Sequence, residues 1–250
     1  ILHKYTEQGM LVLKFGGTSV GSPQAIRSLV SIVQDAEHAG QVRLVVVSAF
    51  SKVTDTLIEM AKKAEAGDQS YAAMVAALKT RHLETVSALI PSRDQSLVQS
   101  YIDDQCTHLE RILDGVAAIG ELSAKTLDLV MSFGERLSAF IIAQVFTSGG
   151  HQAEYLDARQ VIRTDDQFGS ARFLPEETYP RIQAYLANHQ ILQIATGFIG
   201  SAEDGKTTTL GRGGSDLSAA IFGAAIGARE IEIWTDVDGI LTSDPKLVPN

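Results

Sequence analysis

The chain has 250 residues and a formal net charge of −9. An acidic surface repels nucleic acid and anionic lipid, which are bound through clustered Lys and Arg, so we expect neither as a partner. Hydrophobic residues make up 45% of the chain and charged residues 20%, which is typical of a folded protein and argues against disorder.

No targeting or membrane segment is recognisable in the sequence. Apolar runs such as RLVVVSAF are far shorter than the roughly 20 residues of a membrane span, and ILHKYTEQGM lacks the features of a secretory signal, so we expect a cytoplasmic protein. We interpret the single cysteine, Cys106, as a small buried residue of a helix. The six histidines are scattered, so no histidine- or thiolate-based metal site is predicted.

The beginning of the chain predicts a strand–helix–strand unit. The apolar strand LVLKF breaks into a glycine turn, and a helix follows with Ser22 as its N-cap, Pro23 at its first position and Gly40 at its end. The unbroken run VRLVVVSA is typical of a strand that is buried on both faces. This pattern favours an α/β fold with a parallel sheet.

Four further segments carry apolar residues at helical spacing. Residues 54–67, 70–90 and 96–120 predict two or three helices that form a lobe or cover a face of the sheet. Residues 129–150 predict an apolar helix with Gly134 and Glu135 at its start. Strands are expected at 152–158, at 191–200, at the beginning of 206–228, where a glycine-rich turn and a helix follow, and at 230–234.

Four predicted strand ends look alike: KFGGTS, VSAFSKVTD, TGFIG and LGRGGSD, three of which contain glycines. Ligands of open parallel sheets bind outside the carboxyl ends of the strands, where backbone N–H groups and helix N-termini favour anions. Arg212, between glycines, can clamp a carboxylate. Asp216 could be a helix N-cap, Asp236 and Asp238 could form a turn or a nucleotide or magnesium site, and Glu135 could simply favour a helix start.

The motifs taken together resemble those of aspartate kinases, members of the amino acid kinase family. The segments that carry the resemblance are KFGGTSV, SFGERLSA, RTDDQFGSA, TGFIGS, TTTLGRGGSDLSAA and IWTDVDGILTSDP. The resemblance implies a three-layer αβα sandwich with a mainly parallel sheet. It also implies an N-terminal extension over residues 1–10 and a catalytic domain over 11–250, truncated before the family's last nucleotide-facing segment and its regulatory ACT domains. RTDDQFG resembles the lysine-sensitive class.

The resemblance implies that ATP, with Mg²⁺ as its counterion, phosphorylates the side-chain carboxylate of L-aspartate. The product would be 4-phospho-L-aspartate, made in the first step towards lysine, threonine and methionine. A carboxylate is already ionised at pH 7, so the nucleophile needs no general base. The family also implies a homo-oligomer.

Site residues are carried over only where the motifs match. By similarity, Lys14 stabilises the transferred phosphoryl group beside Gly16 and Gly17, and Asp216 orients the lysine. Arg212 holds the α-carboxylate of aspartate and Glu135 its α-ammonium group. The remaining implied residues are Ser48, Thr54 and Phe198 in the aspartate pocket, and Thr235, Asp236, Leu241 and Lys246 at the nucleotide.

Two positions depart from the family pattern, which often has an aromatic residue at Leu241 and an arginine at Lys246. Two other functions therefore stay open. One is a related kinase that acts on another carboxylate or a phosphate, against which Glu135 argues because an N-acetylated substrate has no ammonium group. The other is a non-catalytic module that binds aspartate and nucleotide.

Overall fold

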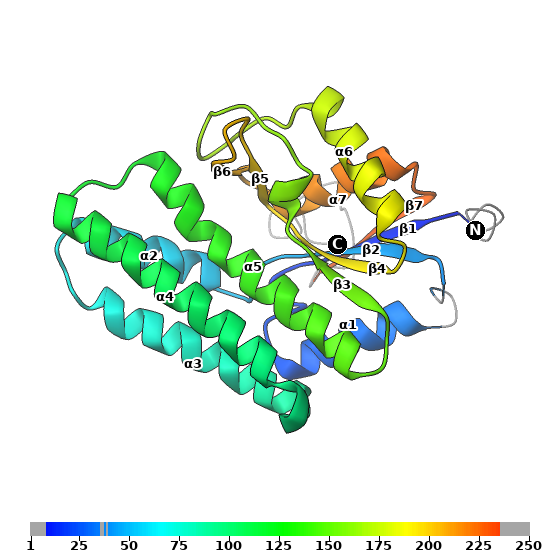
Figure 1. Cartoon of the computed structure of the whole chain (residues 1–250), viewed down its shortest axis with the longest axis horizontal. Coiled ribbons are helices and arrows are strands. Elements are labelled where there is room, and N and C mark those ends of the chain that lie inside the picture. Colours follow the sequence, from blue (N-terminus) through cyan, green and yellow to red (C-terminus); the bar gives the residue numbers. More distant parts are fainter. Residues whose placement is uncertain (1–8, 36–37, 39, 236–250) are drawn as a thin grey trace, which may run out of the picture.

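The computed structural model describes residues 9–35, 38 and 40–235, which form three layers around a parallel sheet (Figure 1). The sheet has five strands in the order β3-β4-β2-β1-β7, and β5 and β6 form a separate antiparallel pair. In chain order the elements are β1 (Leu11–Phe15), α1 (Pro23–Gln34), β2 (Val42–Val47), α2 (Val53–Glu65), α3 (Tyr71–Leu89), the 3-10 helix η2 (Ser92–Asp94), α4 (Ser96–Ile119), α5 (Ala124–Ser148), β3 (Ala153–Leu156), the 3-10 helix η3 (Ala158–Gln160), α6 (Pro175–Asn188), β4 (Leu192–Thr196), β5 (Ile199–Ser201), β6 (Thr207–Thr209), α7 (Gly214–Ile226) and β7 (Glu230–Trp234).

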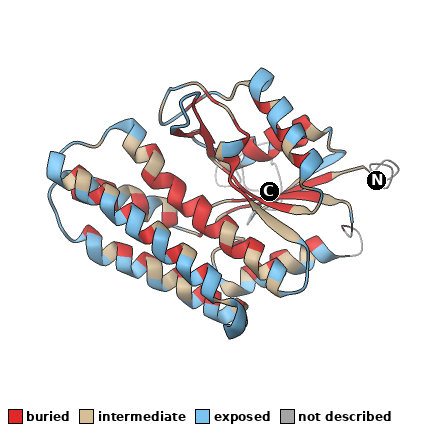
Figure 2. Ribbon diagram, in the orientation of Figure 1, coloured by how far each residue is buried: buried red, intermediate tan, exposed pale blue. Residues whose placement is uncertain are grey.

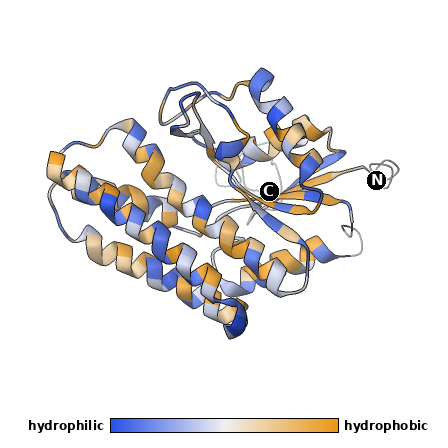
Figure 3. Ribbon diagram, viewed as in Figure 1, coloured by the Kyte–Doolittle hydropathy of each residue, from blue (hydrophilic) through white to orange (hydrophobic). Residues whose placement is uncertain are grey.

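Alternate residues of the central strands face opposite helical layers. Leu13 of β1 packs in the core that α1 to α5 share, whereas Val12 packs in the core that α6 and α7 share. Successive side chains of a strand point to opposite faces, so a strand covered on both sides must be apolar throughout. The central strands β1 and β2 are accordingly coloured mainly as apolar in Figure 3. The predicted αβα sandwich is confirmed.

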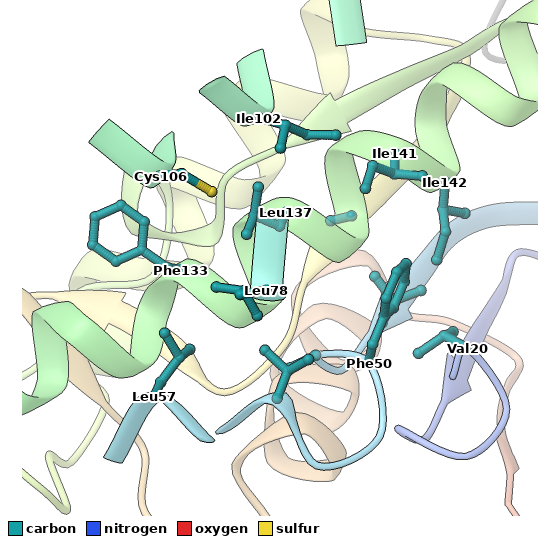
Figure 4. Packing of buried hydrophobic residues seen from close by; sticks show 14 of the residues in the cluster. Val20, Phe50, Leu57, Leu78, Ile102, Cys106, Phe133, Leu137, Ile141 and Ile142 are labelled. Atoms are coloured by element: carbon teal, nitrogen blue, oxygen red, sulfur yellow. The ribbon is translucent and has the colours of Figure 1, made fainter. Parts of the chain in front are cut away.

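Helix α5 lies at the centre of the thicker layer. Figure 2 shows its middle turns as buried, beside the more exposed α3 and α4. Its side chains Phe133, Leu137 and Ile141 meet Cys106 of α4 and Leu57 of α2 in one apolar cluster (Figure 4). By length and composition α5 is the one described helix that could cross a membrane, but 78% of its most apolar stretch is buried inside the protein.

Most predicted boundaries hold, and two are wrong. Ser22 caps α1 by accepting a hydrogen bond from the Ala25 N–H, as predicted. The helix ends at Gln34 rather than Gly40, because the backbone of Asp35 (φ −53°, ψ 152°) leaves the helical region.

The second correction concerns α5, which begins at Ala124 with Ser123 as its cap, so Gly134 and Glu135 lie in mid-helix. The interpretation of Glu135 as a helix-start residue is therefore wrong. Gly134 is required by close packing: a Cβ at this position would lie 2.7 Å from the Ala49 Cβ. The missing side chain lets α5 approach the loop between β2 and α2.

This contact predicts an unusual response to alanine substitution. Gly134→Ala is expected to lower the free energy of unfolding by about 1–3 kcal/mol, because the added methyl group overpacks the contact with Ala49. The control is Gly115→Ala in α4, where a Cβ meets nothing within 4 Å; there the better helix propensity should stabilise the protein by up to about 1 kcal/mol. Denaturant unfolding of both variants measures the difference, and equal stabilisation by both would contradict the packing explanation.

Candidate active site

A cavity of about 670 Å³ opens at the carboxyl ends of β1, β2 and β4, where the loops were expected to converge. It brings together residues that lie far apart in the sequence, from the β1–α1 loop to the start of α7. Of the residues that the sequence predicts for the site, the cavity is lined by Lys14, Gly17, Ser48, Thr54, Glu135, Phe198, Arg212 and Asp216.

The cavity contains a close ion pair. Lys14, near the end of β1, is only 8% exposed, and its Nζ lies 2.6 Å from Oδ1 of Asp216. The lysine has the same strand parity as Val12, so it faces the layer that contains α7. Burying an ammonium group is costly without a partner, and Asp216 supplies one. Asp216 is not the N-cap of α7: Gly213 occupies that position, and Asp216 lies in the first turn.

The two glycines after β1 have different surroundings. A Cβ on Gly17 would lie 3.1 Å from the Ala49 carbonyl oxygen, so the β1–α1 and β2–α2 loops approach closely there. Gly16 does not line the cavity. Its N–H donates to the Trp234 carbonyl, and a Cβ at this position would lie 3.6 Å from the Lys14 Nζ. Gly16 thus lies beside the ammonium group of Lys14, whereas Gly17 allows the two loops to approach each other.

Glu135 presents a half-satisfied carboxyl group to the cavity. The residue is 3% exposed, and its Oε1 accepts one hydrogen bond of 3.2 Å from the Ala49 N–H. Oε2 has no hydrogen-bond partner among the described residues. Burial raises the pKa of Glu135 to about 8. A cationic ligand in the cavity would provide the missing partner and favour the ionised form.

Two helix N-termini also meet at the cavity. Lys52 and Gly213 are the N-cap residues of α2 and α7, both in the left-handed region, and neither helix has a side-chain cap. The free N–H groups and the helix dipoles add partial positive charge to the cavity, whose lining includes Asp55, Glu135 and Asp216 as well as Lys14, Lys52 and Arg212. Lys52 and Arg212 make no ion pair within the described part of the chain.

Several lining residues were missed by sequence reasoning, among them the polar residues Ser51, Lys52 and Ser215. Each is next to or close to a predicted site residue, within VSAFSKVTD or LGRGGSD, and this proximity was the available signal. The left-handed backbone of Lys52 (φ 66°) is uncommon for a residue with a side chain. Phe198 shares this conformation (φ 67°).

The predicted nucleotide stretch is described only in part. Thr235 follows β7, and its Oγ1 lies 3.9 Å from where a Cβ of Gly16 would be. Asp236, Leu241 and Lys246 lie outside the described residues. Within residues 9–235, gaps aside, no three His, Cys, Asp or Glu side chains are grouped to hold a metal ion. Cys106 is buried, as predicted, and burial raises the pKa of its thiol to about 11.

Comparisons with known proteins give consistent matches over almost the whole chain. Residues 9–250 match the amino acid kinase family. Aspartokinase 1, chloroplastic, of Arabidopsis thaliana is 37% identical over 246 residues, covering 94% of this chain and 42% of that protein. The bifunctional aspartokinase/homoserine dehydrogenase 2, chloroplastic, of the same plant is 35% identical, covering 95% and 26%.

Solved structures with the same fold include Escherichia coli aspartokinase III. Its complex with aspartate and ADP (R-state) matches with a TM-score of 0.86 and 33% identity, covering 96% of this chain and 52% of that chain. Its complex with lysine and aspartate (T-state) matches with a TM-score of 0.84. The present chain spans 26% and 42% of the two plant relatives, which contain further sequence.

The buried carboxyl group gives a pH-dependent prediction. In the unfolded state the glutamate has its ordinary pKa of 4.5, but the raised pKa keeps Glu135 protonated in the folded state up to about pH 8. Its contribution to stability is therefore complete below pH 4.5 and is lost as the pH rises to 8. Relative to Glu135→Gln, the wild type should lose on the order of 1.4 kcal/mol per pH unit in that window.

Denaturant unfolding of both proteins from pH 5 to 8 tests this difference. The matched control is Glu84→Gln, which alters an exposed glutamate of α3. A stability difference between wild type and Glu135→Gln that does not change with pH would show that Glu135 is ionised in the folded protein.

Proposed function

The chain belongs to the amino acid kinase family, and on this premise we propose that it is the catalytic part of an aspartate kinase. In the proposed reaction a side-chain carboxylate oxygen of L-aspartate attacks the γ-phosphorus of ATP. A new O–P bond forms, the bond to the β-phosphate oxygen breaks, and 4-phospho-L-aspartate and ADP result. The nucleophile is an anion at pH 7 and requires no base.

One observation carries the proposal: a single cavity holds groups complementary to the α-carboxylate, the α-ammonium group and the transferred phosphoryl group. Arg212 carries a guanidinium group that forms no ion pair with the described residues and suits the α-carboxylate of an amino acid. Glu135 has a buried carboxyl oxygen with no hydrogen-bond partner in the described part of the chain, and this oxygen suits the α-ammonium group. Both residues line the same cavity, so one bound ligand could contact both groups.

Lys14 and the N-terminus of α7 are the elements that suit the transferred phosphoryl group. Phosphoryl transfer depends mainly on positioning and on stabilising the moving negative charge. The Lys14 ammonium group would stabilise that charge, with Asp216 holding the lysine side chain at 2.6 Å and Gly16 beside it. Ser48, Thr54 and Phe198 would complete the walls of the aspartate pocket.

The nucleotide would bind beside the end of β7, through Thr235 and the following residues Asp236, Leu241 and Lys246, and would bring Mg²⁺ with it. The resemblance of IWTDVDGILTSDP to the family's nucleotide stretch supports this part. The aspartokinase III structure that contains ADP and aspartate supports the pairing of these two ligands. The proposal also includes a role towards lysine, threonine and methionine, a cytoplasmic location and a homo-oligomer, each resting on the family resemblance.

The first test is to trap the acyl phosphate. The chain is incubated with Mg-ATP, hydroxylamine and either L-aspartate or L-glutamate, and the hydroxamate is measured. Aspartyl hydroxamate from aspartate alone is the expected result. Hydroxamate from glutamate would favour a kinase for another carboxylate. Binding of aspartate and ATP without hydroxamate, in this chain and in a longer one, would favour a non-catalytic binding module.

Steady-state kinetics should distinguish the roles of Arg212 and Lys14. Arg212→Ala is expected to raise the KM for aspartate by about tenfold or more, because a charge-assisted hydrogen bond is lost. Lys14→Ala should mainly lower kcat, by about a hundredfold, because its interaction strengthens as the phosphoryl group moves. Lys79→Ala is the control, since Lys79 forms a comparable ion pair with Asp103 at 2.9 Å on the surface. Unchanged kinetics in either cavity variant would remove the role given to that residue.

A further inference from the structure

A second carboxylate of α5, Asp128, lies two helical turns before Glu135 and has no role in the reaction proposed above. Residues seven apart lie on the same face of a helix, so both carboxyl groups face the same side. Asp128 is completely buried, whereas carboxylates are rarely buried without strong partners. Its surroundings therefore indicate what it does.

Asp128 accepts three hydrogen bonds from two segments that are not adjacent in sequence. Its Oδ2 accepts from the Gly169 N–H and from the Thr209 N–H, both at 2.9 Å. Its Oδ1 accepts from the Thr209 hydroxyl at 2.8 Å. Burial raises the pKa of this carboxyl group, while the three donors act in the opposite direction. Gly169 and Thr209 both line the cavity.

Gly169 belongs to the loop of residues 165–172, which we call the rim loop. An isolated bridge between Thr164 and Phe173 closes its base. Near its tip, the Gly169 N–H reaches Asp128 and the Ala171 N–H donates to the Thr209 carbonyl at 2.8 Å. The rim loop contains RTDDQFG residues that the proposed reaction does not use. Asp128 and Thr209 thus hold it against the cavity.

The hydrogen bonds of Asp128 with Gly169 and Thr209, which we call the anchor, are connected to Arg212 through the turn after β6. Thr209 is the last residue of β6, and the next N–H, of Leu210, donates to the Phe198 carbonyl at 2.8 Å. A Cβ on Gly211 would lie 2.9 Å from the Oγ of Ser170 in the rim loop. The rim loop and the turn before Arg212 are therefore in direct contact, and Thr209 is bonded to α5 on one side and to the rim loop on the other.

We propose that Asp128 is a positioning residue that fixes the rim loop and the end of β6, and so holds Arg212 where it meets the α-carboxylate of the amino acid substrate. This inference rests on the proposed function for the identity of that substrate. The anchor itself does not depend on any ligand, because all of its donors and acceptors belong to the chain.

The decisive variants are Asp128→Ala and Asp128→Asn. Alanine removes all three acceptor contacts, and the KM for aspartate should rise about tenfold or more while kcat changes less than about threefold. Asparagine can restore the pattern: its carbonyl oxygen accepts from both N–H groups, and its amide N–H donates to the Thr209 hydroxyl. Its KM should stay within about threefold of the wild type.

Two further variants complete the design. Ser132→Ala is the matched control, because the Ser132 hydroxyl is buried in α5 but donates to the Leu129 carbonyl within the helix; its KM should not change. Thr209→Val removes only the hydroxyl donor and should raise the KM by about threefold to tenfold. If Asp128→Ala does not fold, an unchanged KM in Thr209→Val, or a tenfold rise in Asp128→Asn, overturns the proposal.

Amide hydrogen exchange tests the anchor without substrate. The amides of Gly169 and Thr209 should exchange about tenfold faster or more in Asp128→Ala than in wild type, and at wild-type rates in Ser132→Ala. Unchanged exchange at both amides, or a loss of kcat with unchanged KM, overturns the proposal. If the wild type forms no aspartyl hydroxamate, the proposed function fails, while the exchange rates still decide whether Asp128 anchors the rim loop.

Discussion

The close contact between α5 and the loop after β2 determines the geometry of the cavity. Gly134 has no side chain, so the helix backbone comes near Ala49, and the Ala49 N–H reaches Glu135. A larger residue at position 134 would require α5 to lie further away. Glu135 would then lose its hydrogen bond to the Ala49 N–H, and the wall that α5 gives to the cavity would move. Because protein interiors are close-packed, such a shift would also disturb the apolar contacts of Phe133 and Leu137 (Figure 4).

An acidic chain can still bind anionic substrates because the relevant charges are local. The net charge of −9 is distributed over the whole protein, whereas Lys14, Lys52 and Arg212 line one cavity. The uncapped N-termini of α2 and α7 add partial positive charges that come from backbone N–H groups rather than from side chains. Within a cavity these terms are weakly screened, so nearby groups outweigh distant surface charge.

The sequence predicted well those features that depend on short-range patterns. Unbroken apolar strands, the Ser22 cap and the glycine loops are local signals, and parallel strands with loops at one edge follow from them. Features that depend on a distant partner were not predicted. A glycine such as Gly134 is equally consistent with a helix start and with a close approach, and only the position of Ala49, far earlier in the chain, decides between them.

The same limit applies to the anchor at Asp128 and to the antiparallel pair of β5 and β6. Asp128 looks like any polar residue near a helix start, since Gly169 and Thr209 lie far along the chain. The β5–β6 pair has strands of three residues each, too short to give an alternating pattern. Roles could be assigned to Lys14 and Arg212 by resemblance, but the distance between Lys14 and Asp216 became known only from the structure.

The parallel pairing of β1 with β7 has a consequence for how the protein forms. Leu11 is in register with Glu230, so one side of the second strand from the edge stays unpaired until almost all of the described chain has emerged from the ribosome. By contrast, α3 and α4 are neighbours in sequence and can associate early. Non-local pairings close slowly, so the nascent chain exposes an apolar strand edge throughout synthesis. The unpaired edge of β1 is therefore the part of this sheet most open to mispairing before the end of the described chain is made.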